Sequence, residues 1–386
     1  MCPFYPGTAN VTDFEYRFAD RFESSHAIAF PYGRVALFAF LKAMGINQKQ
    51  VIMPAYTCSV VAHAVHLSGN TPIFVDNGAN SFNMDLSQVP ELINSETRVI
   101  IATNTFGYAQ DVDELQQIIE DASSRFGHKI WLVQDCAHAF GASWNDELIG
   151  KSGDVAIYGL NFSKLCTSIF GGMITTSDHD VANHLRDWSE LNIKASTWRK
   201  SLRRYLYLIS ATTALHPTLF EFTWLLKTKT SLLERWTHSF HLDNKIRFPS
   251  DALESLSRLE SRVGINNLEN YSHRIEQRRQ IAQLYDEELH VPQTWTKPPL
   301  QMGATYSHYS ILVPNRYEVL QNWARQGVEL GTVIDYVIPS LPEYKASHYG
   351  LWPNATKIAQ SVINLPFKKP DIVLETAKTL CASYHD

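Results

Sequence analysis

The feature that most constrains the fold is a series of six short, almost continuous apolar runs in the first half of the chain. They are QVIMPA (50–55), TPIFVD (71–76), RVIIAT (98–103), KIWLVQD (129–135), DVAIYGL (154–160) and GGMITT (171–176). Runs of this length without polar alternation are typical of strands that are covered on both faces. Most are separated by segments with helical spacing that end at or near a glycine, at 33–46, 59–69 and 111–127. The alternation predicts an α/β fold whose mostly parallel central sheet has helices on both faces.

The pattern changes near residue 250. Residues 250–289 have the spacing of a long, charged amphipathic helix broken near Gly264. A strand pattern at SHYSILVP (307–314) and helical patterns at 316–327 and 371–382 follow. We therefore predict a large domain over 1–248 and a smaller C-terminal α+β domain over 249–386.

Composition excludes several classes of protein. With 386 residues, 45% of them hydrophobic and 19% charged, the chain can bury a large core and form more than one domain. A formal charge of -5 provides no basic surface for nucleic acid. Five cysteines without CxxC spacing argue against a disulfide framework and against a thiolate metal site. No basic stretch followed by an apolar run begins the sequence, so we expect a cytoplasmic protein.

Two chemically reactive side chains lie at or just past the ends of predicted strands. Asp135 ends the run at 129–135, and Lys164 follows the run at 154–160. Because parallel sheets bind ligands at the carboxyl ends of their strands, the two side chains can converge on one ligand. A lysine amine forms a Schiff base with an aldehyde cofactor, and pyridoxal phosphate needs a carboxylate that keeps its ring nitrogen protonated. On this pattern alone, two solvated surface residues are the alternative.

From about residue 24 onward, several blocks occur in an order that narrows this choice. They are YGRVALFAFL with PAYTCS and TPIFVD, then NTFGYAQDVDEL, then VQDCAHAFGASWNDELIGKSGDVAIYGLNFSK with GGMITT, and finally SVINLPF. Together these blocks resemble the DegT/DnrJ/EryC1/StrS family of sugar aminotransferases. The resemblance implies a fold type I, pyridoxal-phosphate-dependent transferase similar in architecture to aspartate aminotransferase.

The resemblance also implies roles for three residues. Lys164 matches the lysine that forms the Schiff base and moves protons between the substrate carbon and the cofactor. Asp135 matches the carboxylate at the pyridinium nitrogen. His138 matches a position near the ring hydroxyl, and a buried structural histidine is its alternative.

The phosphate-binding end departs from the family pattern. Gly33 and the residues after it open a predicted helix, whose N–H groups and dipole favour a phosphate dianion. Arg34 stands where relatives usually have Ser or Thr, and a guanidinium can pair with phosphate, although a surface arginine is the alternative. Gly159 replaces a phosphate-binding serine, which leaves Asn161 and Ser163 as substitutes.

A second departure concerns the face of the cofactor ring. Relatives often place a stacking aromatic residue after the P-A-x-T block, and this chain has Cys58 there. A cysteine covers less of a ring, so either Tyr56 or another aromatic residue replaces it, or the cofactor is held less firmly. An inert packed thiol is the alternative for Cys58.

The resemblance further implies a homodimer with shared active sites. DNKIRFPSDALESL (243–256) is similar to the loop that reaches the partner's site, which makes Asn244 and Lys245 candidates for contact with substrate or with the partner subunit. A solvated lysine is the alternative for Lys245. His308 lies in the block that faces the site in relatives, and we expect it to be structural.

Residues 198–230 do not resemble the family. This stretch has no charged side chain between Arg204 and Glu221 and is rich in aromatic residues and leucine. His216, Pro217 and Glu221 interrupt it, which argues against a membrane-spanning helix. Two interpretations remain: an insertion packed on the protein, or peripheral membrane contact through 200–228.

We therefore expect a pyridoxal-phosphate-dependent aminotransferase that moves an amino group from an amino-acid donor, such as glutamate, to a nucleotide-linked keto-sugar. Three alternatives are a sugar dehydratase that uses pyridoxamine phosphate, a regulatory or scaffold relative without turnover, and a Rossmann-type enzyme. Lys164 argues against the first because those relatives have histidine there. The lack of a GxGxxG motif after the first strand argues against the third.

Overall fold

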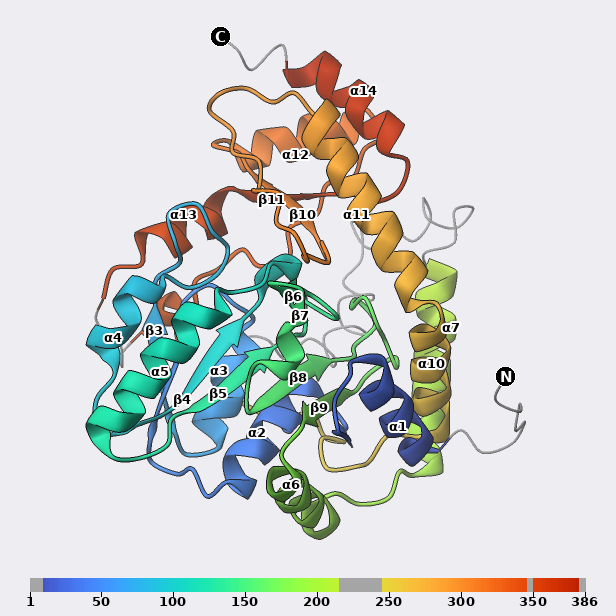
Figure 1. Cartoon of the computed structure of the whole chain (residues 1–386). Helices are drawn as coiled ribbons and strands as arrows, with labels where there is room; N and C mark the ends of the chain where they lie inside the picture. The colour runs from blue at the N-terminus through green and yellow to red at the C-terminus, as the bar shows by residue number, and fades with distance from the viewer. Residues whose placement is uncertain (1–9, 215–244, 346–349, 382–386) are drawn as a thin grey trace. The chain divides into compact units, whose positions relative to one another are not determined.

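The computed structural model of the chain describes residues 10–214, 245–345 and 350–381 (Figure 1). The chain forms two compact units, and each combines separate stretches of sequence. The first unit comprises Met1–Asn47, Ser59–Gly69 and Gly159–Glu269, and the second comprises Gln48–Cys58, Asn70–Tyr158 and Asn270–Asp386. The division near residue 248 stays a prediction.

Within the described part of the second unit, five strands form a parallel sheet in the order β8-β5-β4-β2-β3. They are β2 (Gln50–Pro54), β3 (Thr71–Val75), β4 (Thr97–Thr103), β5 (Trp131–Asp135) and β8 (Val155–Gly159). Most of their side chains are buried, which explains why the sequence shows continuous apolar runs instead of alternation. These runs were predicted as strands, and the structure confirms them.

Helices α4 (Val89–Leu92) and α5 (Val112–Phe126) cover one face of this sheet (Figure 1). Their apolar side chains pack on residues of β2, β3, β4 and β5 in one buried cluster. The Asp111 side chain caps α5 by accepting the Glu114 N–H, and Gly127 ends the helix at φ 68°. A two-strand hairpin, β6 (Ser143–Trp144) and β7 (Glu147–Leu148), follows β5 in the chain.

The C-terminal stretch of the second unit is a smaller α+β arrangement. The antiparallel pair β10 (Tyr309–Leu312) and β11 (Val362–Leu365) is accompanied by four helices, α11 (Tyr271–Glu288), α12 (Arg316–Arg325), α13 (Pro353–Ser361) and α14 (Pro370–Cys381). Asp76, directly after β3, accepts the N–H groups of Asn354 and Ala355 at 3.1 and 2.8 Å. A strand-end carboxylate therefore caps α13.

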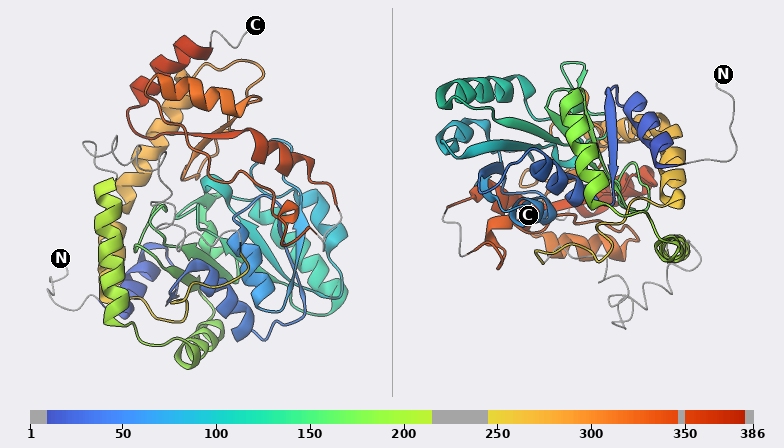
Figure 2. Two further views of the ribbon diagram at one scale, coloured as in Figure 1. Left: turned by 180° about the vertical axis from the view of Figure 1, so that it is seen from behind. Right: turned by 90° about the horizontal axis from the view of Figure 1, so that it is seen from below.

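The first unit combines helices with the antiparallel pair β1 (His26–Phe30) and β9 (Gly172–Thr176). The helices in its described residues are α1 (Val11–Arg21), α2 (Gly33–Ala43), α3 (Ser59–Leu67), α6 (His179–Asn192), α7 (Trp198–Ala214) and α10 (Arg258–Glu269). Helices α7 and α10 lie side by side (Figures 1 and 2). Strand β9 was predicted, whereas the short run that forms β1 was not.

The predicted helix over 250–289 is wrong in its start and in its break. The helical segment begins at Arg258, and the chain is interrupted at Asn270, between α10 and α11. Gly264 lies inside α10, where a Cβ atom would come within 2.4 Å of the Phe14 ring. The glycine therefore allows close packing between α10 and α1 and does not end the helix.

Only the first part of the predicted insertion lies in the described residues, as α7, and residues 215–230 lie outside them. Among the described helices, none has the length and apolar character needed to cross a membrane.

Candidate active site

Asp135 is the last residue of β5 and pairs with Thr103 at the end of β4. The residue is buried, with 9% of its surface exposed. Its Oδ1 atom accepts a hydrogen bond from the Ala137 N–H at 3.0 Å, and Thr103 Oγ1 donates to Oδ2 at 3.5 Å. The turn after the strand thus orients the carboxylate at the edge where parallel sheets bind ligands.

His138 lies on the turn that follows β5 and is also buried. The Phe106 N–H donates to its Nδ1 atom at 3.4 Å, and the two rings stack with centroids 5.9 Å apart and an interplanar angle of 11°. A neutral imidazole that accepts at Nδ1 carries its proton at Nε2, which can then donate to an oxygen. The His308 ring lies 5.4 Å from the rings of both His138 and Phe106.

The loop over residues 104–110 holds the Phe106 ring in this position. The Asn104 side chain donates to Gln134 Oε1 at 3.0 Å and accepts the Gln110 N–H at 2.8 Å. Phe106 and Gly107 both have left-handed backbone conformations, with φ of 57° and 95°. The apolar pattern of the sequence does not indicate that Phe106 or Asn104 belongs to a site. The one sequence feature that could have indicated it is the NTFG stretch between a strand and a helix.

Cys58, which follows β2, is half-buried in the structure. Tyr56, one predicted substitute for the missing stacking ring, is fully buried, and its hydroxyl donates to the Ile334 carbonyl at 3.0 Å. Burial raises the pKa of Tyr56 well above its usual value, so this hydroxyl remains a donor. The Phe106 ring, which stacks on His138, is fully buried as well.

Lys164 belongs to the first unit and is half-buried in the loop over 160–171 that follows β8. Its N–H donates to the Asn161 carbonyl at 3.0 Å, and Ser163 Oγ donates to Asn161 Oδ1 at 3.0 Å. The side chains of the predicted phosphate ligands Asn161 and Ser163 are therefore hydrogen-bonded to each other within one turn. Later in the loop, Ile169 adopts φ 76°, a strained conformation for a β-branched residue that occurs mainly at functional sites.

Gly33 and Arg34 open α2, directly after the N-cap residue Tyr32. The N–H groups of Val35 and Ala36 both donate to the Tyr32 carbonyl at 3.0 Å. The Val35 and Ala36 N–H groups are therefore already bonded, and a phosphate group at this helix start would be bound by the N–H groups that precede them. The roles predicted for Gly33 and Arg34 stay predictions.

Lys245 is exposed, and Asn244 lies outside the described residues. A contact of either residue with a partner subunit or substrate therefore stays a prediction. Within the described ranges, no cluster of three or more histidine, cysteine or acidic side chains could hold a metal ion.

The structure brings the predicted residues together in two groups. Asp135 and His138 share the turn after β5 in the second unit, where His308 joins them through ring contacts. In the first unit, Lys164, Asn161 and Ser163 share one loop, and Gly33 and Arg34 share one helix start. Their assignment to a single cofactor is a proposal, developed below.

The fold is that of the fold type I sugar aminotransferases. The sugar aminotransferase CalS13 from Micromonospora echinospora has a similar structure, with a TM-score of 0.76 over 97% of this chain and 92% of that chain, at 19% sequence identity. Residues 5–217 and 253–384 match the sequence model of the DegT/DnrJ/EryC1/StrS aminotransferase family. The chain therefore belongs to this family, as predicted, and the match includes residues 198–217 of the predicted insertion.

Curated relatives are similar over a shorter range. GDP-perosamine synthase from Caulobacter vibrioides is 34% identical over 177 residues, which cover 46% of each chain. GDP-perosamine synthase from Escherichia coli O157:H7 is 32% identical over 169 residues, or 44% of this chain and 45% of the relative. The chain thus spans about half the length of the curated relatives it matches.

Proposed function

We propose that this protein is a pyridoxal-phosphate-dependent aminotransferase that moves an amino group from an amino-acid donor to a keto-sugar. The observation that carries the proposal is the buried Asp135 carboxylate, oriented at a strand end on the same turn as His138. A carboxylate fits the ring nitrogen of the cofactor, and the Nε2–H of His138 fits its ring hydroxyl. The start of α2 fits its phosphate.

When bound, pyridoxal phosphate supplies an electron-withdrawing ring and a carbonyl that can exchange with amines. In the proposed site, Asp135 keeps the ring nitrogen protonated because its negative charge favours the cationic form. His138 orients the ring through its Nε2–H. Lys164 would hold the cofactor covalently through its Nζ atom, and once the amine of the donor has displaced it, the free Nζ atom would move a proton to or from the substrate carbon.

The proposed acceptor is a nucleotide-linked keto-sugar, and the proposed donor is glutamate. Support comes from the names of family relatives, which include a dTDP-3-amino-3,6-dideoxy-alpha-D-galactopyranose transaminase from Aneurinibacillus thermoaerophilus, 30% identical over 179 residues. We further propose a homodimer in which Lys245 and Asn244 reach the partner's site, where a cation would pair with a diphosphate. We also propose a cytoplasmic location, where these substrates would be available.

The test is a screen of the purified protein against nucleotide keto-sugars, with glutamate as donor and mass spectrometry as readout. The expected product has an amine in place of the carbonyl oxygen, formed only with the donor, and Lys164→Ala forms none. A product that has instead lost water without gaining nitrogen would identify a dehydratase. No conversion of any sugar by a protein that binds the cofactor would favour a regulatory or scaffold role.

We also propose that α7 contacts a membrane surface that contains anionic lipids. On the side of α7 away from the protein core, Trp198, Leu202, Tyr205, Leu206 and Ile209 are all more than two-fifths exposed. Arg199 and Arg203 flank this apolar stripe and are exposed, and the sequence has no acidic residue over 191–220. Aromatic and leucine side chains with flanking cations suit an interfacial helix.

Flotation with anionic vesicles tests this contact. Trp198→Ser combined with Leu206→Ser should abolish co-flotation, because it removes apolar area from the stripe. Leu191→Ser on α6, which is 85% exposed, is the matched control and should float as the wild type does. Equal flotation of all three proteins contradicts the membrane contact, and a change of oligomeric state in the double variant would assign the stripe to a subunit interface instead.

A further inference from the structure

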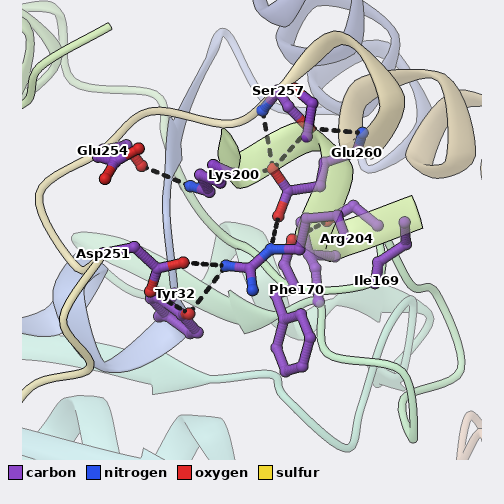
Figure 3. Close-up of polar contacts among 12 residues, drawn as sticks. Tyr32, Ile169, Phe170, Lys200, Arg204, Asp251, Glu254, Ser257 and Glu260 are labelled. Carbon is purple, nitrogen blue, oxygen red and sulfur yellow. Dashed lines mark hydrogen bonds and ion pairs between the residues drawn. The ribbon is translucent and has the colours of Figure 1, made fainter. Parts of the chain in front are cut away.

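A buried cation on α7 lies at the centre of a polar network in the first unit (Figure 3). Arg204 is 1% exposed. Its Nε atom donates to Glu260 Oε1 at 2.7 Å, and its Nη2 atom donates to Asp251 Oδ2 at 2.8 Å and to the Tyr32 hydroxyl at 2.9 Å. The guanidinium also lies 4.5 Å from the centre of the Phe170 ring.

The contact with Tyr32 links this network to the start of α2, because Tyr32 is the N-cap residue of that helix. The Tyr32 hydroxyl accepts from Arg204 and donates to Asp251 Oδ1 at 2.7 Å. The Tyr32 backbone is confined as well, because a Cβ atom on Gly172 would come within 2.5 Å of the Tyr32 carbonyl. Both ends of Tyr32 are thus fixed, one by hydrogen bonds and the other by close packing.

Two further partners of Arg204, Phe170 and Asp251, belong to segments of the first unit for which we propose cofactor or substrate contacts. Phe170 lies in the loop that carries Lys164, and Asp251 lies in the segment that carries Lys245. Glu260 comes from α10, where it also accepts the Ser257 N–H at 2.8 Å in a capping box. A single side chain therefore contacts the helix start, the lysine loop and the 243–256 segment.

Stability alone gives little reason for such a network. Arg204 and Lys200 bring two positive charges, and Asp251 and Glu260 bring two negative ones, all nearly inaccessible to water. Removing four charges from water is costly, and apolar side chains of similar volume often stabilise a protein equally well. What a branched, bidentate guanidinium adds is fixed geometry among its partners.

We propose that Arg204 is a positioning residue that sets the start of α2 for the phosphate group of the cofactor, acting through the Tyr32 hydroxyl. The inference rests on the proposed function and adds to it a residue outside the family's motifs. It requires that a change at Arg204 or Tyr32 alter the recognition of the phosphate group more than that of the rest of the cofactor.

The test compares binding of pyridoxal phosphate with binding of pyridoxal, which lacks the phosphate, by the cofactor-free protein. Tyr32→Phe removes only the bridging hydroxyl, and Arg204→Met removes the guanidinium. The matched control is Lys200→Met, because Lys200 is a buried cation on the same face of α7 that donates to the Glu254 and Ser255 carbonyls at 2.6 and 2.8 Å and does not contact Tyr32. Thermal unfolding of each protein is measured alongside.

We expect Tyr32→Phe and Arg204→Met to weaken binding of pyridoxal phosphate by about threefold to tenfold while leaving the affinity for pyridoxal nearly unchanged. Lys200→Met should lower the unfolding temperature as Arg204→Met does, yet keep the wild-type ratio of the two affinities. If Arg204→Met does not fold, Tyr32→Phe alone decides the question.

The two possible failures are distinguishable. A wild-type protein that binds neither compound overturns the proposed function itself. A wild-type protein that prefers pyridoxal phosphate, together with a Tyr32→Phe variant whose ratio of affinities equals that of the wild type, overturns the positioning role alone. An equal change of the ratio in Lys200→Met would also overturn it, since the effect would then follow from lost charge and not from the contact with Tyr32.

Discussion

The Asp135 carboxylate accepts the Ala137 N–H, and asparagine keeps that acceptor while it removes the negative charge. We expect Asp135→Asn to retain the fold and to lose about a hundredfold in turnover, because a preorganised charge opposite the ring nitrogen is missing. Turnover with glutamate and a keto-sugar measures this. Thr103→Val removes the 3.5 Å hydrogen bond to the carboxylate but keeps its charge, so it should lose much less turnover than Asp135→Asn. Wild-type turnover in Asp135→Asn would remove Asp135 from the site.

The buried carboxyl group of Glu15 makes the stability of the protein depend on pH. Burial raises the pKa of Glu15 from 4.5 to about 6, and the Ala29 N–H and Arg186 offset this only in part. Because the folded state favours the protonated acid, its contribution to stability is present below pH 4.5 and is lost as the pH rises through about 6.

Glu15→Gln keeps an acceptor for the Ala29 N–H but cannot ionise. We expect the free energy of unfolding of the variant, relative to that of the wild type, to rise by about 1 to 2 kcal/mol between acid and neutral pH. A value near the lower figure is expected because the Glu15 side chain is partly exposed. Denaturant unfolding at about pH 5 and about pH 8 measures the change. A difference between the two proteins that does not vary with pH would show that Glu15 has its ordinary pKa.

Only some of the residues discussed above could be identified from the sequence. Asp135, His138 and Lys164 could be chosen from the sequence because their spacing after apolar runs and their block order are local features. Phe106 and Arg204 could not, because their importance arises from a left-handed backbone and from contacts between segments far apart in the chain. Nothing local to Arg204 indicates that this cation is buried.

At the scale of elements, the loop over 104–110 depends on Gly107. This residue has φ 95°, and a Cβ atom would come within 2.7 Å of Thr305 Oγ1 and 2.8 Å of the Tyr306 nitrogen. Gly107→Ala should therefore destabilise the protein by about 2 kcal/mol or more, through backbone strain combined with steric overlap. Denaturant unfolding measures the loss.

Gly127 provides the control for this substitution. It ends α5 at φ 68° but has open space around its Cα atom, so Gly127→Ala should cost only about 1 kcal/mol. Equal losses for the two variants would mean that strain alone acts and that the loop does not pack tightly against residues 305–307.

The six apolar runs predicted strands correctly because strands buried on both faces have little freedom in composition. The break expected near Gly264 was wrong because a glycine pattern cannot distinguish the end of a helix from a close contact with another helix. Strand β1 was missed because HAIAF begins with a histidine and is less fully buried than most of the other runs, and because its pairing partner, β9, lies far along the sequence. Local patterns thus predicted the elements better than they predicted their partners.

At the scale of the whole molecule, the chain passes between the two units several times. A composition shift near residue 250 cannot reveal units built from three separate stretches each, because such units depend on long-range contacts. The family blocks lie in both units, with Asp135 in the second and Lys164 in the first. Sequence order and family membership connect the two residues in our proposal.

The most direct test of the account is to locate the covalent bond to the cofactor. The protein is incubated with pyridoxal phosphate, reduced with borohydride, digested and examined by mass spectrometry, with Asp135→Asn and Lys164→Ala treated in parallel. We predict one modified lysine, Lys164, in the wild-type protein and in Asp135→Asn, and no modified peptide in Lys164→Ala. Modification spread over several exposed lysines, unchanged in Lys164→Ala, would contradict the account.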